Sequence, residues 1–175
     1  FLGITAELTA EQIDFEPLKT AKWLYIEGYL STSDTARAAV KQARALAKEH
    51  GVKIALSLSD PAMVQYARQG LEELMDDGVD LLFCNEQEAL MFTNTETLDA
   101  AIEVLKSNNQ HIVITQGANG AVIIDPANQF HVAGRHVNAV DTNGAGDAFV
   151  GAFLYAINAG LSLDAAAQLA ILISS

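Results

Sequence analysis

Residues 141–149, with the sequence DTNGAGDAF, combine glycines and carboxylates where a helix is expected to begin. Glycine lets the backbone approach a ligand closely and adopt positive φ angles. The free N–H groups in a helix's first turn, together with the helix dipole, form an anion site that needs no basic side chain. Asp147 follows Gly146, so its carboxylate can take a proton from a hydroxyl that attacks a phosphoryl group. The segment therefore predicts a phosphate site with Asp147 beside it.

A purely structural explanation competes with this prediction. Acidic residues are common in the first turn of helices because they stabilise the dipole. Other phosphate motifs fit worse, since the chain has no GxxxxGK[ST] sequence and Phe149 stands where a dinucleotide fingerprint needs its third glycine.

Asn85 and Glu88 follow an expected buried strand, residues 81–84, and their spacing lets both face the same way at a helix start. One interpretation is a variant capping box, in which each residue satisfies a backbone N–H of the helix end. The other places both at the carboxyl end of a parallel strand, where open α/β sheets bind ligands. There Asn85 could reach a phosphate oxygen, and Glu88 could hold a water of Mg²⁺.

The third segment, residues 115–120, follows another expected strand at residues 111–114. The pair Asn119-Gly120 alone would explain it as a hairpin turn. The alternative is a nucleotide-binding edge, where Gly117 and Gly120 let adenine or ribose lie against the backbone.

The remaining candidates carry weaker signals. The four histidines lack the spacing of a metal site. Ser57 and Ser59 lack the context of a nucleophile elbow. Cys84 is expected to be a small buried apolar residue, and the acidic pairs at 72–73 and 76–77 are expected to be solvated.

Short apolar runs alternate with helical patterns along the chain. Because the apolar runs are continuous, they predict a parallel sheet covered on both faces. The expected fold is therefore α/β, doubly wound around a mostly parallel sheet, with a β-hairpin near residues 111–125. Strands are expected at 23–26, 53–58, 81–84, 111–115, 121–125, 129–132 and 137–140, and helices at 33–50, from 60, 71–75, 86–92, 98–107, 146–159 and 163–175.

Composition limits the function classes. The 175 residues are 50% hydrophobic with a formal net charge of −12, so a disordered chain is excluded and binding to nucleic acid or to an anionic membrane is not expected. The single cysteine excludes an internal disulfide and indicates a reducing compartment, so we expect a cytoplasmic protein. No apolar run reaches the ~18 residues of a membrane helix. A chain that starts at Phe1 rather than Met is expected to be part of a longer protein.

The three segments, in this order, resemble the ribokinase-like carbohydrate and nucleoside kinases, the PfkB family. Residues 141–147 resemble the family signature Asp-Thr-Thr-Gly-Ala-Gly-Asp, with Asn143 in place of the second threonine. With Asn143 at that position, the segment resembles the adenosine kinase branch of the family. The Tyr25-Ile26-x-Gly28 motif and residues 80–89 resemble the same branch. The resemblance implies phosphoryl transfer from ATP to the 5′-hydroxyl of adenosine or a similar nucleoside.

The resemblance also implies roles for individual residues. The matches to catalytic groups are Asp147 as the base and the amides of Gly144, Ala145 and Gly146 as the anion hole. The match to the Mg²⁺ and phosphate motif is the pair Asn85 and Glu88. The match to the ATP-contacting turn is Thr115, Gly117 and Gly120. The match to a loop that often binds a monovalent cation such as K⁺ is Asp141 and Asn143.

The resemblance makes residues 1–175 the C-terminal, phosphate- and nucleotide-binding part of the kinase domain. The lid strands and the Gly-Gly turn that read the acceptor are not visible in the sequence, so the segment alone is expected to be inactive. Two alternatives stay open: a sugar kinase of the same family, and a nucleotide-binding module without catalysis. The expected partner is a small nucleoside or sugar, and a homodimer is left open.

Overall fold

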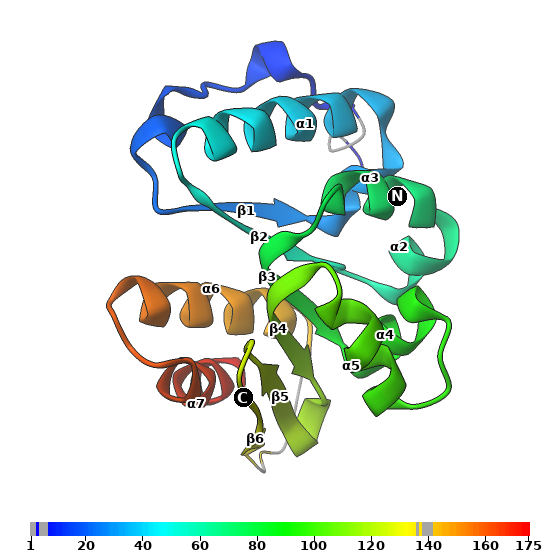
Figure 1. Ribbon diagram of the computed structural model, residues 1–175, viewed down its shortest axis with the longest axis vertical. Helices are drawn as coiled ribbons and strands as arrows, with labels where there is room; N and C mark the ends of the chain where they lie inside the picture. Colours follow the sequence, from blue (N-terminus) through cyan, green and yellow to red (C-terminus); the bar gives the residue numbers. More distant parts are fainter. Residues whose placement is uncertain (1–2, 4–6, 136, 138–141) are drawn as a thin grey trace.

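The computed structural model describes residue 3 and residues 7–135, 137 and 142–175. Its centre is one six-stranded sheet in the order β1-β2-β3-β4-β5-β6 (Figure 1). The first four strands are parallel, whereas β5 and β6 are antiparallel to their neighbours. The strands are β1 (Trp23–Glu27), β2 (Lys53–Ser57), β3 (Val79–Asn85), β4 (Asn109–Thr115), β5 (Gly120–Ile124) and β6 (Gln129–Ala133).

Helices cover both faces of the sheet, as predicted. One apolar cluster joins α1 to α5 to one face, and a second joins α6 and α7 to the other (Figure 1). Burial of both faces explains why the strands are continuously apolar. The helices are α1 (Asp34–Glu49), α2 (Pro61–Tyr66), α3 (Arg68–Met75), α4 (Glu86–Thr93), α5 (Leu98–Lys106), α6 (Ala145–Asn158) and α7 (Leu163–Ser174).

The helix ends follow from local sequence. The Ser33 hydroxyl accepts the Ala36 N–H at 3.4 Å at the start of α1, and Gly51 follows its end with a φ of 68°. Asp60 accepts the Ala62 N–H at 2.6 Å at the start of α2. These are the caps that satisfy orphan backbone groups at helix ends.

The predicted hairpin is confirmed between β4 and β5, which pair in antiparallel register across the turn η5 (Gly117–Asn119). Gly120 has a φ of 101°, and a Cβ there would lie 2.0 Å from the Val132 oxygen of β6. Close packing against β6 therefore explains this glycine. The strand predicted at 137–140 is not assessed, because residues 138–140 lie outside the described residues, and Val137 belongs to no strand.

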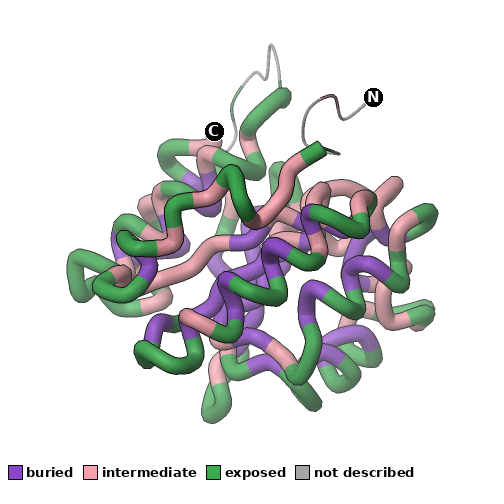
Figure 2. The backbone as a smooth tube through the Cα atoms, turned by 90° about the horizontal axis from the view of Figure 1, so that it is seen from above, coloured by how far each residue is buried: buried purple, intermediate pink, exposed green. Residues whose placement is uncertain are grey.

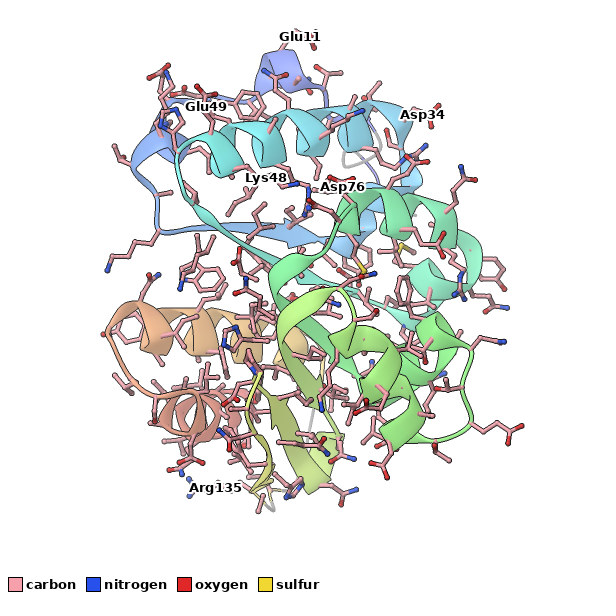
Figure 3. The ribbon with its side chains drawn as sticks, viewed as in Figure 1. Glu11, Asp34, Lys48, Glu49, Asp76 and Arg135 are labelled. Carbon is pink, nitrogen blue, oxygen red and sulfur yellow. The ribbon has the colours of Figure 1, made fainter. Side chains whose placement is uncertain are left out.

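The turn that follows α3, with Asp76 and Asp77, is exposed to solvent, as predicted. Its side chains form ion pairs with α1. Figure 3 shows Lys48 and Asp76 between the two helices, where Lys48 Nζ lies 3.4 Å from the Asp76 carboxylate. Arg44 is buried and donates to the carbonyls of Met75 and Gly78 at 3.0 and 2.9 Å. These bonds cap the end of α3 and fix it against α1.

Buried residues gather in the interior, and the turns that join the elements are mostly exposed (Figure 2). Among the described residues, no helix is long and apolar enough to cross a membrane.

Candidate active site

The first turn of α6 is open. Gly144 precedes the helix with a left-handed φ of 75° and has no side chain to cap it. The Ala145 N–H donates to the Thr142 oxygen at 3.2 Å, and the Ala148 N–H donates to the Gly144 oxygen at 2.8 Å. The amides of Gly146 and Asp147 lie between these two bonded positions, at the positive end of the helix dipole.

No described atom fills this helix start. Gly144, Gly146 and Asp147 are exposed, and a Cβ at either glycine would meet no described atom within 4 Å. A start blocked by side chains would have excluded a phosphate site. The arrangement instead leaves room for an anion, with one change to the prediction: the Ala145 amide already has a partner.

Aromatic packing holds α6 against the carboxyl end of the sheet. Phe153 meets Phe83 edge-on at 5.4 Å between ring centroids, and Phe149 stacks on Phe153 at 6.1 Å. Phe83 lies two residues before Asn85, the last residue of β3. The open turn of α6 is therefore anchored beside the strand end that carries the second predicted motif.

Asn85 and Glu88 form a closed capping box at the start of α4. The Asn85 Oδ1 accepts the Glu88 N–H at 2.8 Å, and the Glu88 Oε2 accepts the Asn85 N–H at 2.9 Å. The Asn85 Nδ2 also donates to the Glu88 Oε1 at 2.7 Å. The structural interpretation of this motif is thus confirmed, while its ligand-binding role stays a prediction.

Glu88 is a buried carboxylate, only 4% exposed. Burial raises its pKa to about 7, the N–H bond from Asn85 opposes the shift, and the charge of Asp60 adds to it. Among the described residues, no lysine or arginine forms an ion pair with Glu88. Such a group is suited to a cation that would favour its ionised form.

The predicted nucleotide turn lies at the same edge of the sheet. Thr115 ends β4 and pairs in register with Asn85 of β3. The Gln116 side chain donates to the Glu86 carboxylate at 2.8 Å, which links the turn to the start of α4. Gly117 is exposed with a φ of 56°. All three predicted motifs therefore meet at the carboxyl edge of the parallel strands.

Carboxylates from four elements face this edge, and Tyr29 lies among them. Burial is the first cause that raises the pKa of its hydroxyl, and four negative charges raise it further. These charges belong to Asp60, Asp147, Glu27 and Glu88.

The predicted monovalent-cation loop is only partly described by the structure. Asp141 lies outside the described residues, and Asn143 is exposed in the turn before α6, so the cation site stays a prediction.

The described residues hold no cluster of three or more His, Cys, Asp or Glu that could bind a metal. Cys84 is buried, as predicted, and burial raises the pKa of its thiol, which disfavours a nucleophilic role.

Glu27 and Asp60 carry no motif in the sequence that indicates a functional role, and Ser59 lacks the context of a nucleophile elbow. These residues follow or end β1 and β2, just as Asn85 and Thr115 end β3 and β4. Their positions at strand ends mark them as candidates for the same edge of the sheet, although the contacts among them cannot be predicted from the sequence.

Comparison with known proteins gives one family. The pfkB family of carbohydrate kinases matches residues 1–175. A mouse (Mus musculus) ribokinase is 32% identical over 159 residues, which cover 78% of this chain and 49% of the relative. The chain spans about half the length of the curated relatives it matches.

Solved structures agree with that family. The crystal structure of an adenosine kinase from Sinorhizobium meliloti is 34% identical, with a TM-score of 0.91, and the match covers 97% of this chain and 52% of that one. A protein described as a ribokinase II from E. coli, solved in complex with ATP and Mg²⁺, is 27% identical with a TM-score of 0.88. That match covers 96% of this chain and 56% of the other.

Proposed function

Because the chain belongs to the pfkB family of carbohydrate kinases, we propose that it carries the phosphate-transfer part of an ATP-dependent kinase that phosphorylates the 5′-hydroxyl of a nucleoside such as adenosine. The observation that carries this proposal is the open first turn of α6, where Gly144 provides no side-chain cap, a Cβ at Gly144 or Gly146 would meet no described atom within 4 Å, and the residue Asp147 is exposed. An exposed carboxylate at that position can accept a proton from a hydroxyl.

The chemistry is mainly positioning and charge stabilisation. The amides of Gly146 and Asp147 receive the negative charge that develops on the transferred phosphoryl group. The Asp147 carboxylate takes the proton from the acceptor hydroxyl as its oxygen attacks phosphorus. Phe153 holds these groups in place through its contact with Phe83 of β3, and Phe149 stacks on Phe153.

Glu88 suits a magnesium site in this kinase. Its buried carboxylate has a raised pKa and no described cationic partner, and it lies in the charged surroundings that also include Asp60 and Asp147. Mg²⁺ keeps several waters and takes few protein ligands, so Glu88 would hold one of those waters while Asn85 reaches a phosphate oxygen. When bound, Mg²⁺ offsets the negative charge of the triphosphate.

The nucleotide would lie along the turn after β4. Thr115 and Gly117 border the same edge as Asn85, and the exposed Gly117 leaves the backbone accessible. We assign ATP to this turn, with Gly120 shaping it through its packing on β6. Asn143, with Asp141, would bind K⁺ next to the start of α6.

A sugar kinase is the second candidate, because the mouse ribokinase is 32% identical to this chain. The transfer step would be the same and only the acceptor would differ. A non-catalytic nucleotide-binding module is a third candidate, which the retained carboxylates Asp147 and Glu88 disfavour.

The test is a coupled ADP-release assay on the full natural chain that contains residues 1–175, with adenosine compared against ribose and fructose. We expect Mg²⁺-dependent turnover with adenosine. Turnover with a sugar alone would assign the sugar kinase, and ATP binding without transfer to any acceptor would contradict catalysis. Residues 1–175 alone should give little or no turnover, because they lack the part expected to orient the acceptor.

A further inference from the structure

Ser59 has an unusual backbone conformation at the carboxyl edge of the sheet. It lies two residues after the end of β2 and has a φ of 70°. Residues other than glycine rarely adopt this left-handed region, and such strain clusters at functional sites. The surrounding bonds show what the conformation achieves.

The Ser59 side chain joins the ends of β1 and β2. Its Oγ accepts the Gly28 N–H at 2.7 Å and donates to the Glu27 Oε2 at 2.9 Å. Its own N–H donates to the Ser57 Oγ at 3.0 Å. A hydroxyl has one proton, so the 2.9 Å contact with a carboxylate takes it, and the bond is charge-assisted.

Gly28 makes this geometry possible. A Cβ at Gly28 would lie 2.6 Å from the Leu58 oxygen and 2.7 Å from the Ser57 oxygen, so only glycine fits there. The end of β1 is therefore pressed against the end of β2. Together with the Ser59 bonds, this contact gives the Glu27 carboxylate a defined position.

Glu27 is held on the side of the sheet that faces α6. Tyr25, two residues earlier in β1, packs against the α6 cluster. Burial raises the pKa of the Tyr25 hydroxyl, and the charges of Glu27 and Asp147 raise it further. The Tyr25 hydroxyl is buried, and its interaction with the Glu27 carboxylate adds to the rise of its pKa. Glu27 and Asp147 thus act on one buried hydroxyl from two elements.

We propose that Ser59 is a positioning residue for the acceptor end of the site, an inference that rests on the kinase function proposed above. The charges of Glu27 and Asp147 both act on the hydroxyls of Tyr25 and Tyr29, so an acceptor hydroxyl that approaches Asp147 would come near the end of β1, where Glu27 is fixed. A fixed carboxylate accepts hydrogen bonds from hydroxyl groups of a sugar or nucleoside. Loss of the Ser59 hydroxyl would free Glu27 to move and would weaken acceptor binding without touching the nucleotide.

The experiment uses two variants of the full natural chain, Ser59→Gly and Ser59→Ala. Both remove the hydroxyl, but glycine tolerates the left-handed conformation and alanine does not. We expect the KM for the acceptor to rise by roughly tenfold in both variants, while the KM for ATP stays within about twofold. Asn94→Gly is the matched control, because Asn94 is left-handed at the distant end of α4, with a φ of 54°. It should leave both KM values unchanged.

The outcomes separate the two proposals. An acceptor KM that rises only in Ser59→Ala and follows the loss of thermal stability would show a merely structural role and overturn the positioning role. An unchanged acceptor KM in both variants would overturn it as well, with the kinase function intact. Failure of the wild-type protein to phosphorylate any acceptor would overturn the kinase function itself and this inference with it.

Discussion

The helices α4 and α6 both begin at the carboxyl edge of the sheet, but they begin in opposite ways. At α4, Asn85 and Glu88 satisfy each other's groups through three hydrogen bonds, and Glu88 is buried. At α6, Gly144 offers no cap and Asp147 is exposed. A closed helix start stabilises the fold, whereas an open one leaves amides available to a ligand.

The difference shows how one structural element serves two purposes at the same edge. In α4 the side chains supply the missing hydrogen bonds, so the helix start is stable before any ligand arrives. In α6 Gly144 supplies no side-chain cap, so an anion can take the place that a capping side chain would occupy. Substitutions at one helix start at a time test this difference.

Asp147→Asn tests the open start most strongly. The variant keeps the shape of the side chain but removes the base, so kcat should fall by about 10²–10⁴-fold. ATP affinity should stay nearly unchanged, because the amides remain in place. Steady-state kinetics and ATP binding by calorimetry on the full natural chain check both. Asp164→Asn, in the first turn of α7, is the matched control and should keep full kcat. Full kcat in the Asp147 variant would refute the base.

Glu88→Gln tests the closed start. The folded pKa of Glu88 is about 7, above its ordinary 4.5, so the folded state holds its proton more tightly than the unfolded state. The stability that Glu88 contributes is therefore fully present below its unfolded pKa of 4.5 and is lost as pH rises through the folded pKa, by roughly 3 kcal/mol in total.

Urea unfolding at about pH 5 and about pH 8 measures this effect. The variant should lose most of the difference that Glu88 causes in the wild type, whereas Glu103→Gln, on the exposed side of α5, should retain it. An identical pH dependence in the wild type and Glu88→Gln would show that Glu88 is ionised without cost.

Gly146→Ala should separate stability from activity. A Cβ at Gly146 meets no described atom within 4 Å, and alanine favours helices, so stability should rise by about 0.5–1 kcal/mol. If a phosphoryl group docks there, the methyl group displaces it, and kcat should fall by roughly tenfold to a hundredfold.

Gly151→Ala is the control for this change, because Gly151 is an exposed glycine of the same helix with equal room for a Cβ. It should add stability and keep activity. Equal activity in both variants would place the phosphate elsewhere.

Asn85→Ala tests the cap of the closed start alone. Loss of the cap should cost about 1 kcal/mol, and slightly more because Glu88 loses a donor. Ser162→Ala removes the cap of α7, where Ser162 Oγ accepts the Ala165 N–H at 3.3 Å, and gives the reference value. Thermal unfolding compares the two. A cost at Asn85 well below that at Ser162 would mean that the α4 start is not closed in solution.

The sequence predicted the elements well because their signals are local. Apolar runs located six strands, and caps such as Ser33 and Asp60 located helix starts. The parallel sheet followed from continuous burial, and the hairpin followed from Asn119-Gly120. The capping box at Asn85 and Glu88 was predicted as well, because its spacing alone defines it.

Tertiary contacts limited the prediction of the site. The pKa of Glu88 depends on its burial and on Asp60, which is distant in sequence. Ser59 acts through bonds to Glu27 and Gly28 across two strands, and no local motif marks such a contact. The Ala145 amide was predicted to be free but is occupied by Thr142, a bond that depends on the turn conformation.

Residue-resolved amide hydrogen exchange at the start of α6 tests the central claim most directly. The full natural chain is compared alone and with ADP, aluminium fluoride, Mg²⁺ and the acceptor, a mixture that mimics the transferring phosphoryl group. Exchange at Gly146 and Asp147 should slow markedly in the complex, while Ala145, already bonded to Thr142, should change little. Formation of the complex with unchanged exchange at both Gly146 and Asp147 would contradict the account.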